Sequence, residues 1–517
     1  METRRHLKRS RARLLFASIL PILASLGCGS LASGGAVAST SHPLVAQYTI
    51  TNPHDGLSAW VEFGTDTNYG RQTSLVPGNE VISILVAGMR FNTTYHMRAH
   101  VTWTGGSWVD QDHTFTTGGP PSSPAFPALK VSRPDPSAAS PENPGIEMID
   151  GDAPTSNLMQ AFFTDRDGNP IWYYDVGTGN WPFPYKLLPN GHFVFFIILP
   201  PPGVSILREV DLTGATVREM NANQLNAKML AAGFDFAPTF YHHDMYPLPN
   251  GHLIVLTNFI KQFTDLPGYP GTMGVIGDGL IDLDENWNPV WAWNSFDYLD
   301  VNRHLNGLPD WTHGNAVLYT QQDGNLLFSM RHQSWVIKID YSNGLGTGKI
   351  LWRLGYQGDF SLAQGTDPSL WFSFQHFPSV VNQNGSHTTL AIWDNGNNRV
   401  LDTSGTICGT PTTAPCYSRA TVYDVDESSM IANLAWADGL PYFSIWGGSI
   451  NQLENGNIEY DINSPLIPPS TGVASEVREV TPTALPQTVW QMDIPDPVFA
   501  YRAYRWSSLY PDVTWQY

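Results

Sequence analysis

One short unit recurs along most of this chain, and it limits the fold more than any other feature. The unit is an Asn-Gly or Asp-Gly turn followed by a strand-forming run. Its glycines are Gly191, Gly251, Gly324, Gly385 and Gly456, at intervals of 60, 73, 61 and 71 residues. Such turns connect antiparallel strands. A unit repeated at this period therefore predicts an array of small antiparallel sheets.

A second unit strengthens this prediction. It is a strand, a turn and an apolar strand that usually holds tryptophan, and it occurs six times, around Trp172, Val217, Trp291, Trp352, Trp436 and Trp490. Six copies over about 380 residues give a period of about 63, which is long enough for a four-stranded propeller blade with loops. The sequence therefore predicts an all-β protein with a six-bladed β-propeller over residues 128–517.

A smaller β domain is expected before the propeller, over residues 43–118. Short strand runs alternate there with Asn, Asp and Gly. Residues 91–98 and 114–118 resemble a fibronectin type III domain, in which a tyrosine of a late strand ties back to the preceding corner. Residues 119–127 form a proline-rich linker. The front domain is thus predicted to be a fibronectin type III-like β-sandwich.

Charge excludes several classes of partner. The chain has 27 basic and 46 acidic residues, a net charge of −19, and only 14% charged residues. Nucleic acid and anionic membrane surfaces require a basic face, so neither is an expected partner. Beyond the start of the chain no run of 18 uninterrupted apolar residues occurs, and no membrane span is expected.

The start of the chain has the three parts of a secretory signal peptide. Residues 1–38 combine a basic start, an apolar run and the small-residue site Ala36-Val37-Ala38, so cleavage is expected after Ala38. The expected location is periplasmic or extracellular. Two variants stay open: Arg4-Arg5 allows the twin-arginine route, and Cys28 allows a lipid anchor.

Two cysteines follow the leader, Cys408 and Cys416. In an exported protein a local disulfide is favoured over two free thiols. Cysteine-based catalysis is disfavoured for the same reason.

Histidines occupy matched positions in three successive repeats. His243, His313 and His376 each stand six to ten residues before the repeat turn, and His242 is adjacent to the first. Arg331 ends the strand that follows His313. Equivalent positions in a propeller lie at equivalent radii, so these side chains are expected to converge on the axis.

Other chemistries lack a complete motif. His242-His243-Asp244 has metal-ligand residue types, but neither a His-x-x-x-His spacing nor a carboxylate cluster completes a site. The Gly-x-Ser-x-Gly elbow of serine hydrolases is absent. No metal and no cofactor are predicted.

Seven ordered strings together resemble the bacterial arylsulfotransferase family, whose members need no nucleotide donor. They are His242-His243-Asp244 with Leu248-Pro249-Asn250-Gly251, Asp310-Trp311-Thr312-His313-Gly314-Asn315, residues 329–334 running to 337–340, Trp352-Arg353-Leu354-Gly355, Phe374-Gln375-His376, Asp394-Asn395-Gly396-Asn397 and Tyr417-Ser418-Arg419-Ala420. The resemblance covers roughly residues 128–510.

This resemblance implies a six-bladed propeller with an axial site. In such a site a sulfuryl group passes from a phenolic sulfate ester to a histidine and then to a phenolic acceptor. Carried over by motif, His376 is the nucleophile, and His313, Asn315, Arg331 and either His243 or His242 complete the site. The residue types suit the reaction, because sulfuryl transfer needs fixed cations, a proton donor and a nitrogen or oxygen nucleophile.

Two other hypotheses remain at this point. One is a non-catalytic extracellular propeller that binds a protein or glycan through its face. The other is a quinoprotein-like oxidoreductase, since such propellers also use an Asp…Gly…Trp unit, although they have more blades.

Overall fold

Antiparallel β-sheets make up almost the whole fold, which confirms the predicted all-β class. The computed structural model describes residues 33–135, 138, 140–153, 156–200, 204–440, 443–463 and 472–516. These ranges contain one α-helix, α1 (Ala222–Ala231), and four short 3-10 turns, η1 (Ser295–Asp297), η2 (Arg331–Gln333), η3 (Ser342–Gly344) and η4 (Pro368–Leu370). None of the described helices is long and apolar enough to cross a membrane.

Two sheets form the front of the molecule. One has β1 (Gly34–Ser39), β2 (Ala46–Thr51) and β6 (Val81–Val86); the other has β3 (Leu57–Gly64), β4 (Arg71–Gln72), β5 (Val76–Gly78), β7 (Thr94–Trp103), β8 (Gly106–Val109) and β9 (His113–Thr116). Buried and exposed positions alternate along β2 and β3, the period expected of strands with one face on a core. We refer to this part as the front domain.

Strand β1 overlaps the expected leader. It pairs with β2 over its full length, from Gly34 opposite Thr51 to Ser39 opposite Ala46. Cleavage after Ala38 would leave only Ser39 of this strand, so the folded front domain uses residues that the sequence assigned to the signal peptide. The rest of the expected leader, residues 1–32, lies outside the described residues, as does Cys28.

Six further sheets follow. Their strands, in chain order, are β11 (Ile146–Asp152), β12 (Ala161–Thr164) and β13 (Pro170–Tyr174); β14 (Trp181–Leu187), β15 (Phe193–Leu199), β16 (Val204–Val210) and β17 (Thr216–Asn221); β18 (Phe240–Pro247), β19 (Leu253–Leu266), β20 (Tyr269–Leu283) and β21 (Pro289–Asn294); β22 (Gly314–Thr320), β23 (Asn325–Met330), β24 (Trp335–Ile339) and β25 (Ile350–Leu354); β26 (Ser361–Leu362), β27 (His376–Asn384), β28 (His387–Asp394), β29 (Arg419–Asp426) and β30 (Ile431–Gly439); and β31 (Ser449–Gln452), β32 (Ile458–Asn463), β33 (Val473–Val480) and β34 (Thr488–Pro495).

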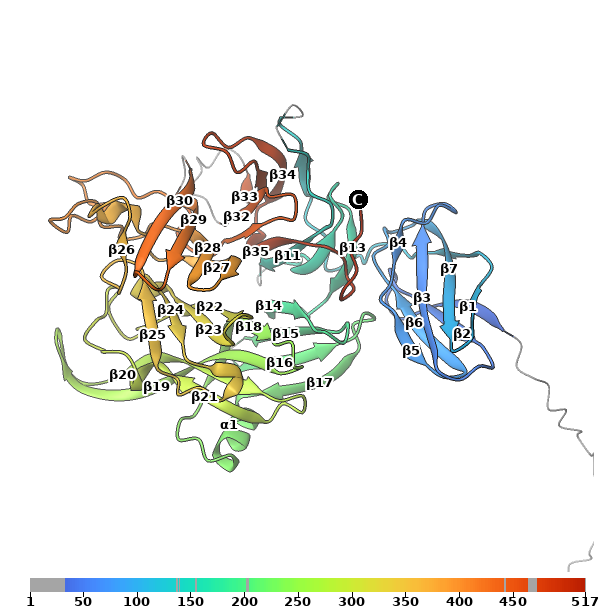
Figure 1. Ribbon diagram of the computed structural model, residues 1–517, viewed down its shortest axis with the longest axis horizontal. Helices are drawn as coiled ribbons and strands as arrows, with labels where there is room; N and C mark the ends of the chain where they lie inside the picture. Colours follow the sequence, from blue (N-terminus) through green and yellow to red (C-terminus); the bar gives the residue numbers. More distant parts are fainter. Residues whose placement is uncertain are drawn as a thin grey trace, which may run out of the picture.

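The two ends of this region exchange strands. The last strand, β35 (Phe499–Trp506), pairs with β11 in the first of the six sheets, and the early strand β10 (Lys130–Ser132) pairs with β34 in the last. One strand of each sheet contacts a strand of the next sheet: β14 contacts β18, β18 contacts β22, β22 contacts β27, β27 contacts β31, and β31 contacts β35. We call these the leading strands. The six sheets therefore lie side by side around a common centre (Figure 1).

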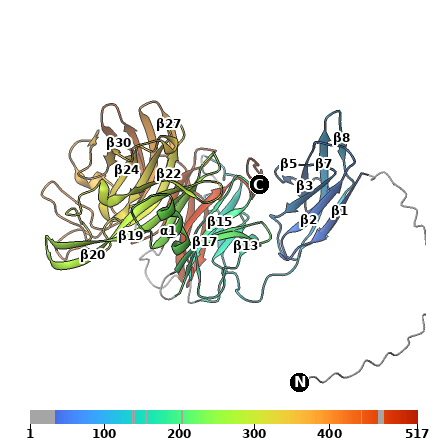
Figure 2. The ribbon, with the colours of Figure 1, turned by 90° about the horizontal axis from the view of Figure 1, so that it is seen from below.

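The front domain stands beside this group of sheets and packs against the end of the chain (Figure 2). Trp515 contacts Phe63 edge to face, with ring centroids 5.8 Å apart, and the Tyr510 hydroxyl donates to the carbonyl of Leu85. A cavity of about 760 Å³ lies at this junction, lined in part by Trp60 and residues 189–192. The predicted site histidines lie elsewhere.

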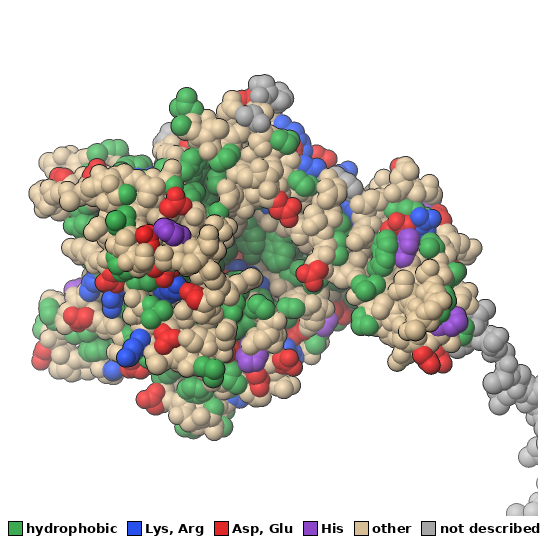
Figure 3. Space-filling view, viewed as in Figure 1, with side chains coloured by type: hydrophobic (Ala, Val, Ile, Leu, Met, Phe, Trp, Pro, Cys, Tyr) green, Lys and Arg blue, Asp and Glu red, His purple; other side chains and the backbone are tan. Residues whose placement is uncertain are grey.

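The predicted disulfide is present. Cys408 and Cys416 are bonded and close a short loop between β28 and β29. In the space-filling view the molecule is hollowed near the middle of the six sheets, and apolar side chains line the hollow (Figure 3).

Candidate active site

Three strands, β18, β22 and β27, bring the predicted residues together. His243 lies on β18, His313 immediately precedes β22, Asn315 is on β22 and His376 begins β27. The ring centroids of His243 and His313 are 4.7 Å apart. The ring centroid of Tyr501 on β35 lies 5.9 Å from that of His243 and 6.0 Å from that of His376. Residues that are distant in sequence thus share one buried centre.

Backbone irregularity aims these histidines at the centre. The register of each leading strand shifts beside the histidine: between Tyr241 and Met245, between Gly314 and Ala316, and between His376 and Ser379. His243 and His313 also have positive φ values of 57° and 47°. Such bulges and left-handed residues cost free energy and re-aim side chains, and they concentrate at functional sites.

His376 has one protonated ring nitrogen and one that carries a lone pair. Its Nδ1 lies 2.7 Å from Oδ1 of Asn395. The Asn395 amide donates through Nδ2 to the carbonyls of Ser444 and Gly447, at 2.9 and 3.0 Å, which fixes Oδ1 as the acceptor. His376 Nδ1 therefore carries the proton and Nε2 the lone pair. Burial, and secondarily the charge of Arg331, lowers the pKa of His376 well below its usual range, so the ring is neutral at pH 7.

Nε2 of His376 faces the backbone of a loop that covers the centre. The Gly447 N–H donates to it over a long 3.3 Å. A neutral imidazole in this position is a nucleophile that needs no deprotonating base.

His243, and not His242, faces the other site histidines. Nε2 of His242 points away from them to Oδ1 of Asp278, at 3.2 Å, while its Nδ1 lies 2.7 Å from Nδ1 of His243. Burial lowers the pKa of His243 well below its usual range, and the nearby charges of His313 and His242 act in the same direction. The structure thus separates two residues that the sequence left equivalent.

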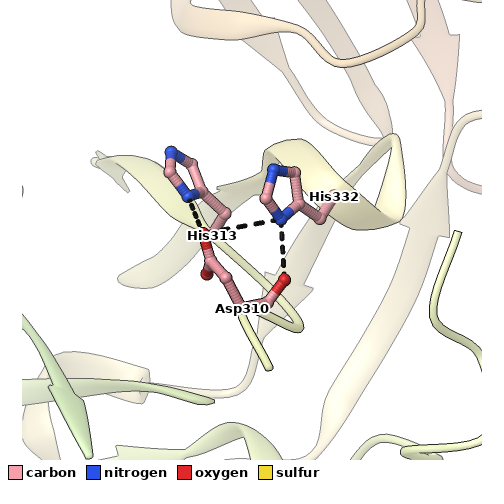
Figure 4. Close-up of side chains that lie close together, drawn as sticks. All are labelled: Asp310, His313 and His332. Atoms are coloured by element: carbon pink, nitrogen blue, oxygen red, sulfur yellow. Dashed lines mark hydrogen bonds and ion pairs between the residues drawn. The ribbon is translucent and has the colours of Figure 1, made fainter. Parts of the chain in front are cut away.

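His313 differs from His243 because it has a carboxylate partner of its own. Its Nδ1 lies 2.6 Å from Oδ2 of Asp310, and its ring stacks on that of His332 with centroids 4.5 Å apart (Figure 4). His332 Nδ1 in turn lies 2.8 Å from the backbone carbonyl of Asp310. Sequence reasoning did not assign roles to Asp310 and His332, although both stand inside the strings that it singled out.

The donor atoms of Asp310, His313 and His332 are close enough together to suggest a metal site. The hydrogen bonds of His332 argue against one. Its Nε2 faces two N–H donors, Arg331 Nη1 at 2.8 Å and Asn306 Nδ2 at 3.1 Å, so Nε2 must be the acceptor and Nδ1 must carry the proton. A protonated Nδ1 is not a metal ligand, and these three residues fit a hydrogen-bonded chain better than a metal centre.

Arg331, the predicted cation, follows β23 and lies next to His332. Its guanidinium donates to His332 through Nη1 and to the carbonyl of Ile445 through Nη2, at 3.0 Å, and lies over the ring of Phe374. Its Nε is buried and has no hydrogen-bond partner among the described residues. An unpaired, buried guanidinium nitrogen is costly, which makes it a ready donor to an anionic oxygen.

The last strand contributes two residues that sequence reasoning missed. Arg502 pairs with the buried Asp244 at 2.7 Å, and its Nη2 donates to the backbone carbonyls of His243 and Asn315. Arg502 thereby fastens β35 to β18 and β22. Tyr501 has a buried hydroxyl without a hydrogen-bond partner in the described ranges. Neither residue stands in a repeat or a motif string, so no local signal identified it.

Comparison with known proteins gives one informative result. Residues 136–502 match the family described as Arylsulfotransferase (ASST). No curated protein sequence matches the chain.

Several solved structures are similar to this chain at a low level, among them the following two. One is the dihydro-heme d1 dehydrogenase NirN, at 12% identity over 75% of this chain and 83% of that chain, with a TM-score of 0.31. The other is the apocarotenoid oxygenase of Synechocystis, in its cobalt-substituted form, at 12% identity over 89% of this chain and 96% of that chain, with a TM-score of 0.33. Similarity at this level carries no argument about fold or chemistry.

Proposed function

This chain belongs to the arylsulfotransferase family, and on that premise we propose that it moves a sulfuryl group from a phenolic sulfate ester to a phenolic acceptor through a sulfo-histidine at His376. Family membership supports aryl sulfotransferase activity in general. The observation that carries the finer proposal is the fixed lone pair of His376 Nε2, together with Arg331, whose charge helps to lower the pKa of His376 and whose buried Nε has no hydrogen-bond partner among the described residues.

The fold proposal follows the same premise. The six sheets around the centre are the blades of a six-bladed β-propeller over residues 128–517, with β35 as the innermost strand of the blade that begins with β11. The pairing of β35 with β11 and the contacts between successive leading strands support this arrangement. The front domain is a fibronectin type III-like sandwich over residues 43–118, with β1 added at the edge of one sheet, and a linker over 119–127 follows it.

The first half-reaction loads the histidine. Nε2 of His376 attacks sulfur, the S–O bond to the phenol breaks, and the leaving oxygen takes the Nε2 proton of a protonated His313. Arg331 and the Asn315 amide hold the sulfuryl oxygens, where charge accumulates in the transition state. A fixed donor of this kind is worth roughly 3–4 kcal/mol of transition-state stabilisation.

The second half-reaction reverses these roles. The neutral His313 takes the proton of the incoming phenol, the phenolate oxygen attacks sulfur, and the S–N bond breaks with its electron pair returning to His376. His243 stays neutral throughout, because burial and the surrounding positive groups oppose its protonation. No metal and no cofactor take part in this proposal.

We also propose export to the periplasm or the cell exterior. The Cys408–Cys416 disulfide supports an oxidising location. The sequence leaves two points open. Export could follow the general or the twin-arginine route, and Cys28 could carry a lipid.

The test is turnover of a chromogenic aryl sulfate with and without added phenol. We expect phenol-dependent release of the chromogenic product, with parallel lines in double-reciprocal plots, as a ping-pong route requires. His376→Ala should abolish release, whereas the matched control His387→Ala, an exposed histidine of the same sheet, should retain it. Activity retained in folded His376→Ala would refute the role of this residue.

A further inference from the structure

Asp310 connects the two functions of the site, although it lies outside the innermost strands. It belongs to the loop before β22, and it meets His313 through its carboxylate and His332 through its carbonyl (Figure 4). His332 is in turn joined to Arg331. Hydrogen bonds on both sides of Asp310 therefore connect the guanidinium proposed to hold the sulfuryl group with the histidine proposed to move the proton.

The loop that carries Asp310 is held from both sides. The N–H of Ile276 on β20 donates to the carbonyl of Pro309 at 2.8 Å, and the N–H of Trp311 donates back to the Ile276 carbonyl at 3.1 Å. The N–H groups of Arg331 and His332 donate to the carbonyls of His313 and Thr312. Asp310 is thus placed by backbone contacts on two neighbouring sheets and does not depend on His313 for its position.

The protons of these hydrogen bonds have one consistent arrangement. Arg331 can only donate, so Nε2 of His332 accepts and its Nδ1–H donates to the Asp310 carbonyl. The Asp310 carboxylate accepts from Nδ1–H of His313. Burial by itself raises the pKa of Asp310, but the hydrogen bond and charge of His313 outweigh it and hold that pKa below its usual range.

We propose that Asp310 is the positioning residue of the proton-transfer histidine, and this inference rests on the proposed function. It keeps the proton of His313 on Nδ1, directs Nε2 to the reacting oxygen and stabilises the imidazolium by remaining a carboxylate. The proton that reaches the leaving phenolate comes from Nε2 of His313, and the proton that returns comes from the acceptor phenol. Asp310 itself neither gains nor loses a proton over the cycle.

The other carboxylate–histidine pair of the centre makes the assignment specific. Asp278 reaches His243 only through His242, and it also accepts from the Gly314 N–H. A carboxylate one ring away stabilises a charge on His243 less than direct contact does, because the interaction falls with distance. His313 is therefore the site histidine equipped to carry a transient positive charge.

The experiment compares wild type and Asp310→Asn on a series of aryl sulfates whose leaving phenols differ in pKa. Esters of weakly acidic phenols need protonation of the leaving oxygen, whereas nitrophenyl sulfate leaves well without it. We expect kcat/KM of Asp310→Asn to fall about 10²–10⁴-fold on the former, the usual worth of general acid catalysis, and less than about tenfold on the latter. A plot of kcat/KM against the pKa of the leaving phenol should therefore be steeper for Asp310→Asn than for wild type.

Asp402→Asn is the control, because Asp402 is an exposed carboxylate whose hydrogen bonds stay within its own loop, and it should leave the rates on all donors unchanged. An equal loss of kcat/KM on all donors, or no loss, would overturn the role of Asp310. Asp310→Glu should be more active than Asp310→Asn on esters of weakly acidic phenols. If wild type transfers no sulfuryl group from any donor, the proposed function itself fails. The two failures are therefore distinguishable.

Discussion

The front domain and the centre of the six sheets bury side chains for opposite reasons. In β2 and β3 of the front domain the buried positions are apolar: Tyr48, Ile50, Val61 and Phe63 pack together, and the positions between them are only half-buried. In the centre His376, Asn315, Asp244 and Arg502 are all less than about a tenth exposed and none is apolar. Regular strands carry the first region, whereas bulged strands carry the second.

This difference indicates which parts of the chain are built for stability and which for chemistry. Alternating apolar strands minimise free energy without strain. Buried imidazoles and unpaired donors raise it, and a fold retains them where they contact a ligand. If the comparison holds, changes in the two regions affect different measurements.

The largest expected effect on stability lies in the front domain. Phe63→Ala removes a fully buried ring that contacts Trp515 and Tyr95. It should lower the free energy of unfolding by about 3–5 kcal/mol, as large core truncations do. Chemical denaturation measures this change, and kcat below the melting temperature should stay at the wild-type value. A large fall in kcat would mean that the front domain takes part in catalysis.

Arg331→Gln is the reciprocal change in the centre. The loss of the guanidinium should lower kcat about 10²–10³-fold, because its hydrogen bonds develop with charge in the transition state. Steady-state kinetics measures the change, and denaturation should show a small effect on stability. A large loss of stability with an unchanged kcat would contradict this comparison.

Acid should weaken both regions through one histidine each. Burial lowers the pKa of His42, at the front domain, and of His332, in the centre, from about 6.5 to about 4. Between about pH 4 and pH 6.5 the unfolded chain therefore binds more protons than the folded chain. Each neutral histidine contributes up to about 3 kcal/mol to the free energy of unfolding; this contribution is complete above about pH 6.5 and is lost as the pH falls towards 4.

Urea unfolding at pH 7 and pH 5 tests this expectation. His42→Gln should reduce the acid sensitivity of stability without changing kcat. His332→Gln should reduce the acid sensitivity of stability and should also lower kcat. Equal acid sensitivity in His42→Gln and wild type would show that His42 is not the titrating group.

Removal of residues up to Ala38 should have the smallest effect. It deletes β1, an edge strand whose residues are mostly not buried, and should lower the free energy of unfolding by about 1–2 kcal/mol with activity unchanged. The mass of the mature N-terminus shows whether the cell makes this cut. A start before Gly34 would place processing upstream of the expected site.

Much of this organisation was predictable from the sequence. The repeat turns and tryptophan strands predicted an all-β fold, and Cys408 and Cys416 predicted the disulfide. The strings around His313 and His376 predicted candidate site residues, and the structure brings these residues close together. These signals are local, and each repeats or lies within a few residues.

The remainder depends on contacts that no local pattern records. The choice between His242 and His243 is decided by a bulge in β18 and by Asp278 of β20. The positions of Tyr501 and Arg502 follow from the pairing of β35 with β11, which joins residues more than three hundred positions apart. The strand at Gly34–Ser39 was hidden by its resemblance to a leader.

Mass spectrometry of the protein after rapid mixing with donor, without acceptor, tests the central claim most directly. We predict that one sulfuryl group is added per chain, that fragmentation places it on His376, and that added phenol removes it while His376→Ala never acquires it. Turnover to transferred product with no mass change at any mixing time, or a label on another residue, would contradict the sulfo-histidine route.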